Sequence, residues 1–392
     1  MNFTPFMLLP FDSLPSLIGF ENSYSQLFPA LLVYSPLVFL IALFMPHKFR
    51  RIKSIEWIII STIIIYLILL TFFVHLVPNI EQYNFTFSSF IRQFIALLAG
   101  LLIYLSFRFF NVSQKLMIKH ITIGTLMTVP IVLYQIFIGI DGFFRIKGFS
   151  TEPSHFGHFL AFAALPAVLM DELKSFKNKL LFFYVNLCVL LTFSITTYFS
   201  VLLLYLFWGY MHYGFKVFKY FTFIIFIVPV VFLSINYFDY EYVMTNLSFF
   251  LSIEAFELGL QSSASLTDRF YSVWIPLKSL FSFNTIFGYG VAGDYFVLKD
   301  LMPSQAYELI SSVRSGDVGI SSFFGKIVIW GGWFLSTAFF LISIHLYQNA
   351  PKQIRIFALP VFISSFFSMG SLVYPYIWLW LAILNNAQDE SQ

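Results

Sequence analysis

The sequence predicts an all-α, polytopic integral membrane protein. Of its 392 residues, 59% are hydrophobic and only 10% are charged, and the mean hydropathy is +0.83. A single water-soluble core cannot bury that much apolar surface. Runs of about twenty apolar residues, the length that crosses roughly 30 Å of hydrocarbon, recur along nearly the whole chain. Together these observations predict a single membrane domain over residues 1–392, without a separate soluble domain.

About eleven membrane spans are expected from the apolar runs. They lie near 27–45, 57–77, 90–109, 119–139, 156–170, 180–194, 197–213, 218–236, 320–346, 354–371 and 374–386. The fifth, sixth and eleventh of these runs are short. The first twenty residues lack a basic flank and a small-residue cleavage site, so we expect an interfacial segment there and not a cleaved signal peptide.

The positions of Lys and Arg predict the orientation, because short loops rich in these residues stay on the cytoplasmic side. Most of the 22 basic residues lie in every second loop, at 46–56, 108–119, 171–179, 212–219 and 347–355. This pattern places the N-terminus outside and the C-terminus inside. The other basic residues lie in or near outward-facing segments, namely Arg92, Arg145, Lys147, Arg269, Lys278, Lys299, Arg314 and Lys326. Their position indicates a need for positive charge on the outer side.

The only long hydrophilic interval, 237–319, is expected on the same extracytoplasmic side. It is rich in aromatic and aliphatic residues, and a loop of this length between packed spans is usually functional when it is ordered. An amphipathic helix is expected near 265–282, lying on the membrane surface after a start that resembles a capping box, Ser265-x-x-Asp268. Its apolar residues recur at helical spacing, at Phe270, Val273, Trp274, Leu277 and Phe281. Arg269 then stands at the head of this helix.

The most polar stretch of the apolar region runs from 145 to 162. Pro153 suits the first turn of a helix and Thr151 or Glu152 suits its cap, so the fifth span should begin here. A helix N-terminus beside Arg145 and Lys147 would form an anion site. Glu152 and His155, three residues apart, share a helix face and could form an acid–base pair. The alternative is structural, since Glu152 could cap the helix or pair with Arg145, and interfacial histidines and bases commonly snorkel.

Several other patterns indicate no further function. Gly288-x-Gly290-x-x-Gly293 has the dinucleotide-binding spacing, but no βαβ unit surrounds it. His155 and His158 could share a metal ion, yet no third ligand is evident, so no metal is expected. Cys188 can form no intrachain disulfide and is expected to pack in a span. The net charge of +3 is small and scattered, which argues against nucleic-acid binding.

The outward-facing polar residues fall into three short motifs. The first is RIKG at Arg145–Gly148, followed by EPSHFG at Glu152–Gly157 at the start of a helix. The second is the helix headed by Arg269, which runs into FGYG at Phe287–Gly290. The third is DVG at Asp317–Gly319, ahead of a span that contains two adjacent glycines.

These motifs, their order and their shared outer side resemble those of integral-membrane O-antigen polymerases and the related O-antigen ligases and exopolysaccharide polymerases. The closing YPYIWLWLAILNN at Tyr374–Asn386 is similar to the last helix of that family. The resemblance covers roughly 90–386. The ligase branch usually has a histidine at the end of the large loop, and this chain has none between His212 and His345. The polymerase branch is therefore the better match.

The resemblance implies a glycosyltransferase-C-like fold and transfer of an oligosaccharide from undecaprenyl pyrophosphate to a second lipid-linked repeat unit, with inversion at the anomeric carbon. It implies a bacterial cytoplasmic membrane location, an active site facing the periplasm or exterior, and a chain-length regulator and a flippase as partners. No cofactor is expected, and because no Asp-x-Asp metal motif lies on the outer side, cations must stabilise the leaving group. The expected catalytic residues are Glu152, His155 and Asp317, and the expected substrate-binding residues are Arg145, Lys147, Arg269, Arg314 and Arg92.

Two alternatives remain at this point. One is a ligase-type glycosyltransferase. The other is a transporter of a small anion or a lipid-linked glycan, for which ionisable residues inside spans and paired broken helices would be typical. The spans are nearly free of such charge, with Lys326 as the main exception.

Overall fold

The computed structural model describes residues 4–11, 52–76, 87–110, 113–138, 146–150, 152–171, 175–216, 260, 263–281, 286–313, 318–369, 372 and 374–391. Within these ranges every regular element is a helix, which confirms the all-α class. Five helical segments are long and apolar enough to cross a membrane. The described part of the chain is therefore that of a helical membrane protein.

The five candidate spans coincide with expected ones. They are formed by α3 (Ser54–Leu76), α4 (Phe87–Phe109), α5 (Gln114–Met127) with α6 (Val129–Ile138), α7 (Pro153–Phe159) with the π-helix η5 (Leu160–Ala164) and α8 (Leu165–Met170), and α17 (Phe323–Asn349). Four further helices lie at expected spans but are shorter or less apolar, namely α9 (Phe176–Leu191), α10 (Ile195–Tyr213), α18 (Lys352–Ser364) and α19 (Pro375–Ser391). The expected spans 27–45 and 218–236 lie outside the described residues.

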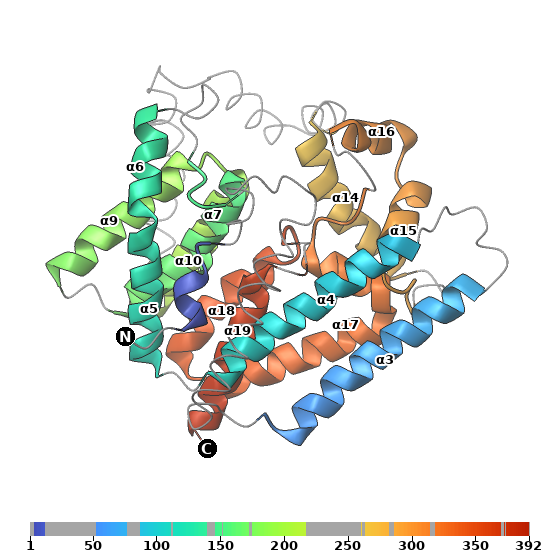
Figure 1. Ribbon diagram of the computed structural model, residues 1–392, viewed down its shortest axis with the longest axis horizontal. Helices are drawn as coiled ribbons and strands as arrows, with labels where there is room; N and C mark the ends of the chain where they lie inside the picture. The colour runs from blue at the N-terminus through green and yellow to red at the C-terminus, as the bar shows by residue number, and fades with distance from the viewer. Residues whose placement is uncertain are drawn as a thin grey trace.

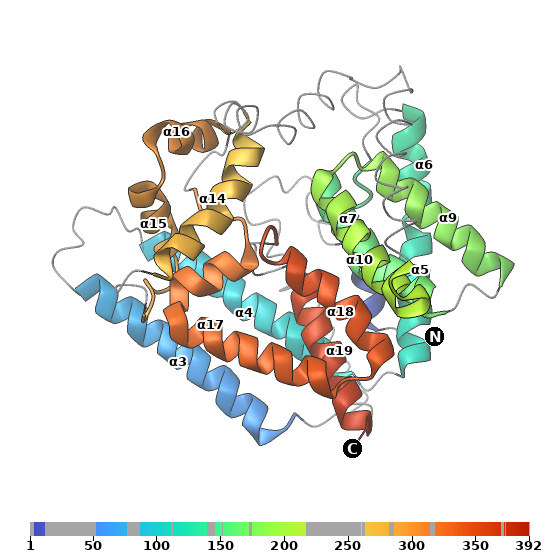
Figure 2. The ribbon, with the colours of Figure 1, turned by 180° about the vertical axis from the view of Figure 1, so that it is seen from behind.

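Helix α19 lies at the centre of the molecule. It packs against α4, α17 and α18, and its Tyr376, Leu379 and Ala382 are fully buried. Helices α5 to α10 lie on one side of α18 and α19, and α3, α4 and α14 to α17 lie on the other (Figures 1 and 2). Helix α3, by contrast, exposes large apolar side chains such as Phe72 and Phe73. An outer surface of this kind is stable only against hydrocarbon.

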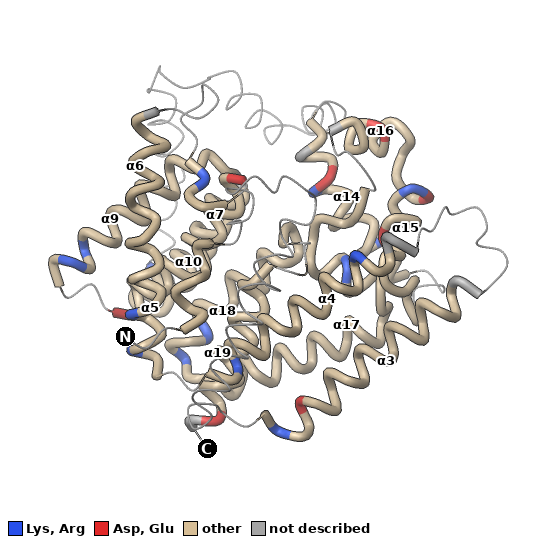
Figure 3. The backbone as a smooth tube through the Cα atoms, in the orientation of Figure 1, with Lys and Arg blue, Asp and Glu red and all other residues tan. Residues whose placement is uncertain are grey.

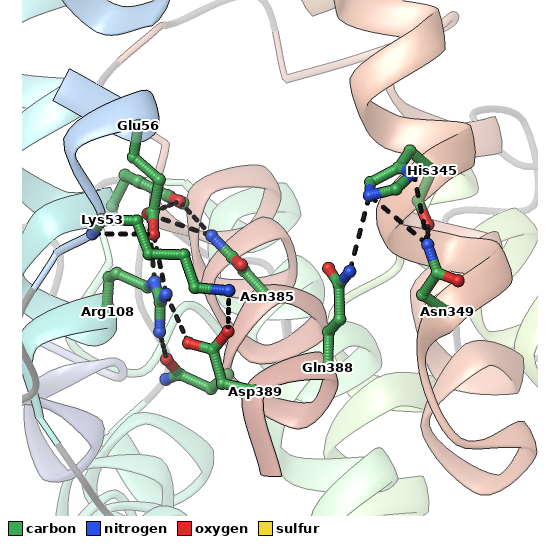
Figure 4. A network of polar contacts seen from close by, with 10 residues as sticks. Lys53, Glu56, Arg108, His345, Asn349, Asn385, Gln388 and Asp389 are labelled. Carbon is green, nitrogen blue, oxygen red and sulfur yellow. Dashed lines mark hydrogen bonds and ion pairs between the residues drawn. The ribbon is translucent and has the colours of Figure 1, made fainter. Parts of the chain in front are cut away.

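One end of the helices is joined by a network of polar contacts centred on Arg108 (Figure 4). The Arg108 side chain is fully buried, and its Nη2 lies 2.7 Å from Oε1 of Glu56 and 2.6 Å from Oδ2 of Asp389. Its Nη1 donates to Oδ1 of Asn386 at 2.6 Å. Lys53 also pairs with Asp389, at 2.8 Å. The network ties α3, α4 and α19 together, and it compensates a buried charge that would otherwise be costly.

Charged residues are concentrated around the C-terminus and, on the opposite side, around the starts of α7 and α14 (Ala264–Ser279) and near α16 (Ser304–Val313) (Figure 3). Lys53 and Arg108, from two of the loops expected to face the cytoplasm, belong to the first group, because both pair with Asp389. The apolar bodies of the helices lie between the two groups.

Helix α17 is broken at Gly332, whose φ of +60° is non-helical. Around the break, the carbonyl groups of Ile329 and Trp330 accept hydrogen bonds from the backbone N–H groups of Tyr289 (2.8 Å) and Gly290 (3.0 Å). The N–H of Trp333 donates in turn to the carbonyl of Ile286 at 3.0 Å. The segment 286–290 thus supplies the partners that the broken helix lacks, as burial in an apolar environment requires.

The expected amphipathic helix is α14, but its start differs from the expected one. Its N-cap is Ser263, whose Oγ accepts from the N–H of Leu266 at 3.4 Å, and the capping box at Ser265 does not form the start. The periodicity of the apolar residues does not show whether Ser263 or Ser265, two residues apart, caps the helix. The helix exposes Trp274 and Leu277 and buries Thr267 and Ser272.

The described part of the N-terminal segment packs against other helices. Residues 4–11 form a short 3₁₀ helix, η1 (Pro5–Leu8), that packs against α5 and α4 with Phe6 and Met7 buried. Oγ1 of Thr4 lies 2.6 Å from Nδ1 of His120 on α5. The apolar residues that favoured a membrane surface are instead covered by neighbouring helices.

The break in α17 can be tested with Gly288→Ala. Gly288 has a φ of +87°, and a Cβ there would lie 2.6 Å from the backbone of Trp330 and Gly332. Gly214, at the end of α10, has a φ of +59° but open space around it. Alanine costs about 1–3 kcal/mol of backbone strain at either position, and at Gly288 it also unpairs buried carbonyl groups, at about 1–3 kcal/mol each. We expect Gly288→Ala to lower the melting temperature in detergent clearly more than Gly214→Ala; equal shifts would contradict this account of the break.

Candidate functional site

The candidate site lies where α7, α14 and the beginning of α19 approach one another. In Figures 1 and 2, α19 begins between α7 and α14. The starts of α7 and α14 carry polar groups expected to face outward, and the beginning of α19 contributes an aromatic residue, Tyr374. The side chains concerned come from parts of the chain that are far apart in sequence, so only the tertiary fold brings them together.

Glu152 and His155 form a pair at the start of α7. Glu152 is extended, with φ −128° and ψ 149°, and Pro153 follows as the first helical residue. The Oε2 atom of Glu152 lies 3.9 Å from Nε2 of His155 and accepts a hydrogen bond from Oγ of Ser154 at 3.1 Å. Within the described residues, the Glu152 side chain makes no capping hydrogen bond to α7. The carboxylate is 67% exposed and the imidazole 13%, so the pair is open to a reactant on the carboxylate side.

Tyr374 covers the two histidines of α7 from the start of α19. Its ring stands edge-on to His155, with 4.8 Å between ring centroids, and edge-on to His158, with 5.5 Å. The His158 ring is stacked on Phe162 at 5.5 Å. Sequence reasoning treated His158 only as one half of a metal pair, and it gave Tyr374 no role. Among the described residues, no group of three His, Cys, Asp or Glu side chains is placed to hold a metal ion.

Arg269 on α14 lies close enough to His158 for a Coulombic interaction between them. The helix that carries it is fixed to the segment before α17. Asp268 accepts a hydrogen bond from Oγ of Ser321, and Ser272 Oγ accepts from the N–H of Ser321 at 2.8 Å. These hydrogen bonds fix α14 relative to the segment before α17, and the interaction with His158 indicates that the guanidinium lies toward α7. A fixed cation of this kind is suited to a phosphate group.

The loop before α7 is held by Gln135 of α6. Its Oε1 accepts from the N–H groups of Lys147 and Gly148, both at 3.0 Å, and its Nε2 donates to the carbonyl of Gly148 at 2.8 Å. Gly148 has a φ of +54° and lies against Phe156. This clamp fixes the backbone of Lys147 five residues ahead of Glu152.

Arg92 belongs to a different cluster, at the start of α4. Its Nη2 donates to the hydroxyl of Tyr295 on α15 (Gly293–Leu301) at 3.2 Å, and Gln93 donates to the same hydroxyl. Lys326 on α17 donates to Oε1 of Gln93 at 3.4 Å. Burial and the neighbouring charge of Asp294 raise the pKa of Tyr295 to about 12, so the phenol is protonated at neutral pH. Sequence reasoning identified Arg92 but found no signal for Tyr295.

Asp294 anchors this second cluster. Its carboxylate is fully buried and accepts from Nε1 of Trp330 at 2.7 Å and from the N–H of Ile320 at 3.0 Å. The residue joins α15 to α17 and to the segment that precedes α17. This role is structural, because the observed donors all come from the protein itself.

The structure thus brings Glu152, His155 and Arg269 to neighbouring segments and places Arg92 with Tyr295. The other expected site residues, Arg145, Arg314 and Asp317, lie outside the described residues.

No protein-family model matches the chain, and no curated protein sequence matches it significantly.

Proposed function

We propose that the chain is an O-antigen or exopolysaccharide polymerase, which joins undecaprenyl-pyrophosphate-linked oligosaccharide repeat units at the outer face of the bacterial cytoplasmic membrane. The observation that carries this proposal is the convergence of α7, α14 and α19. A carboxylate–imidazole pair, a guanidinium and a layer of aromatic rings meet there, from the segments that resemble the motifs of that family.

The proposal includes a topology of about eleven spans with a glycosyltransferase-C-like arrangement. The N-terminus is outside, the C-terminus is inside, and 237–319 lies on the extracytoplasmic side with the site. The separation of charged residues between two sides of the molecule supports this topology (Figure 3). Lys53 and Arg108, from two loops assigned to the cytoplasm, meet at Asp389.

In the proposed reaction, a hydroxyl oxygen of the acceptor repeat unit attacks the anomeric carbon of the donor saccharide. The bond between that carbon and the pyrophosphate oxygen breaks, and its electron pair leaves with the pyrophosphate. Arg269, with Lys147 and the arginines at 145 and 314, stabilises the charge that develops on the leaving group. The attack from the opposite face inverts the anomeric carbon.

The hydroxyl proton passes to the Glu152–His155 pair, with Asp317 as the other expected base. The exposed carboxylate of Glu152 orients the hydroxyl, and the largely buried imidazole of His155 holds the carboxylate. A general base of this kind contributes typically 10²–10⁴-fold to a rate. Arg269 acts from α14 and Glu152 from the start of α7, so the carboxylate of Glu152 and the pyrophosphate leaving group need not be adjacent.

A transporter for a small anion or a lipid-linked glycan is the main alternative from another class. Broken spans in transporters use their freed carbonyl groups to bind ions. In α17 the carbonyl groups of Ile329 and Trp330 are already hydrogen-bonded to Tyr289 and Gly290. This arrangement favours the enzyme over the transporter. The ligase-type enzyme shares the site chemistry and differs in its acceptor.

The topology is tested by reporter fusions. We expect fusions near residue 145 and near Ser263 to report an extracytoplasmic location, and fusions after Lys352 to report a cytoplasmic one, because basic residues alternate between loops. Cytoplasmic activity from the fusion near Ser263 would exclude an outward-facing site.

The role of Arg269 is tested by replacing it with lysine. A guanidinium donates paired hydrogen bonds to phosphate that an ammonium cannot reproduce. We expect Arg269→Lys to reduce polymer formation in membranes by about 10- to 100-fold, nearly as much as Arg269→Ala. Lys278→Ala, which removes an exposed cation from the same helix, is the matched control and should retain activity. A fully active Arg269→Lys variant would show that Arg269 contributes only its positive charge and not paired hydrogen bonds to phosphate.

The role of Glu152 is tested by Glu152→Gln, which keeps the shape of the side chain and removes its charge. We expect normal accumulation in the membrane but a polymerisation rate lower by about 100-fold or more, so that lipid-linked single units accumulate. Glu152→Asp should also be strongly impaired, because it shortens the reach of the carboxylate. The measurement is a glycan ladder read beside membrane protein abundance.

Glu308→Gln on α16 is the matched control for Glu152→Gln, since Glu308 is an exposed glutamate in the same loop region as the site. It should leave the ladder unchanged. Full-length ladders from Glu152→Gln would exclude Glu152 as the base and would assign that role to Asp317.

A further inference from the structure

His158 is a buried imidazole without a hydrogen-bond partner among the described residues. It is only 4% exposed, and neither Nδ1 nor Nε2 has a partner among the described residues. Buried polar groups nearly always have one, because an unpaired group has lost its hydration without compensation. His120 on α5 shows the usual situation, since it is equally buried and its Nδ1 lies 2.6 Å from Oγ1 of Thr4. Several other buried side chains also have an atom without a partner, but at His158 both ring nitrogens lack one, which leaves a donor and an acceptor for a bound molecule.

The surroundings of His158 indicate what kind of molecule that is. Aromatic rings enclose the imidazole, with Phe162 stacked on it, Tyr374 edge-on to it, and Tyr376 against Phe162 at 5.9 Å. A neutral imidazole offers one donor and one acceptor, which matches a hydroxyl group. A phosphate offers acceptors only and is better served by Arg269. An aromatic enclosure with one such polar group is typical of a site for an amphipathic ligand such as a pyranose ring.

We propose that His158 is a saccharide-binding residue, whose ring nitrogens exchange hydrogen bonds with hydroxyl groups of the sugar joined directly to pyrophosphate in the lipid-linked donor. This inference rests on the proposed function, because it takes Arg269 to be the pyrophosphate contact. Arg269 is near enough to His158 for a Coulombic interaction, so a pyrophosphate held by Arg269 brings the first sugar near the imidazole. Tyr374, which stands edge-on to both histidines, is the ring that the sugar displaces on entry.

The first test compares His158→Phe with His120→Phe in the full-length protein in lipid nanodiscs, without added ligand. If His158 serves a ligand and not the fold, phenylalanine removes an unsatisfied polar group, and the melting temperature should rise by about 2–4 °C. The same substitution at His120 breaks an existing hydrogen bond and should lower the melting temperature. A fall at both positions would show a structural role for His158 and would overturn the inference.

The second test measures binding by thermal shift with two probes. One is undecaprenyl pyrophosphate, and the other is the undecaprenyl-pyrophosphate-linked repeat unit extracted from cells that lack this chain. The wild type should bind the saccharide-bearing lipid more tightly. In His158→Phe we expect the Kd for that lipid to rise about 10-fold, toward the value for undecaprenyl pyrophosphate, whose own Kd stays unchanged. His158→Gln, which keeps a donor and an acceptor, should retain part of the preference.

The outcomes separate the inference from the proposed function. If the wild type binds neither lipid, the proposed function is overturned, and the inference with it. If the wild type prefers the saccharide-bearing lipid and His158→Phe retains that preference in full, the inference alone is overturned. Loss of binding of both lipids in His158→Phe and His158→Gln would likewise exclude a specific contact with the sugar.

Discussion

The structure depends on one constraint, which is that every backbone polar group inside hydrocarbon must find its partner within the protein. Two irregular places in the described helices show how the chain satisfies this constraint. At the break in α17, the N–H groups of Tyr289 and Gly290 supply the missing donors. In the α7–α8 span, Pro166 has no N–H for the carbonyl of Phe162, and Nε1 of Trp380 donates to that carbonyl at 2.9 Å. The second repair joins α19 to the α7–α8 span, and so it fixes the position of Tyr374 over the histidines.

Two buried groups show how differently the chain treats its polar side chains. Arg108 is fully buried, and carboxylates and an amide surround its guanidinium, so it serves to join helices (Figure 4). His158 is nearly as buried and has no hydrogen-bond partner in the described part of the chain. A satisfied network stabilises one arrangement of helices, whereas an unsatisfied buried group reduces stability. The chain therefore satisfies the buried charge of Arg108 and leaves the imidazole of His158 uncompensated among the described residues.

Much of the fold was predictable from the sequence, because long apolar runs such as those of α3, α4 and α17 leave the chain no alternative to a helix in hydrocarbon. The Glu152–His155 pair was predictable from its spacing along a helix. The contact of Tyr374 with both histidines and the cluster around Tyr295 were not, because they join residues far apart in the chain. The packing of residues 4–11 was also missed, since composition does not distinguish a buried apolar segment from one at a membrane surface.

Helix α14 shows how a membrane changes the meaning of a hydrophobic pattern. In a soluble protein, the apolar face of an amphipathic helix is the face that packs on the core. Here Trp274 and Leu277 are exposed, while Asp268 and Ser272 contact the rest of the protein. The exposed side of α14 thus carries large apolar residues, and the side that contacts the segment before α17 carries polar ones beside the buried Ile275. Arg269 follows directly after Asp268 on this helix and interacts with His158. The polar contacts that fix α14 therefore also determine where its arginine lies.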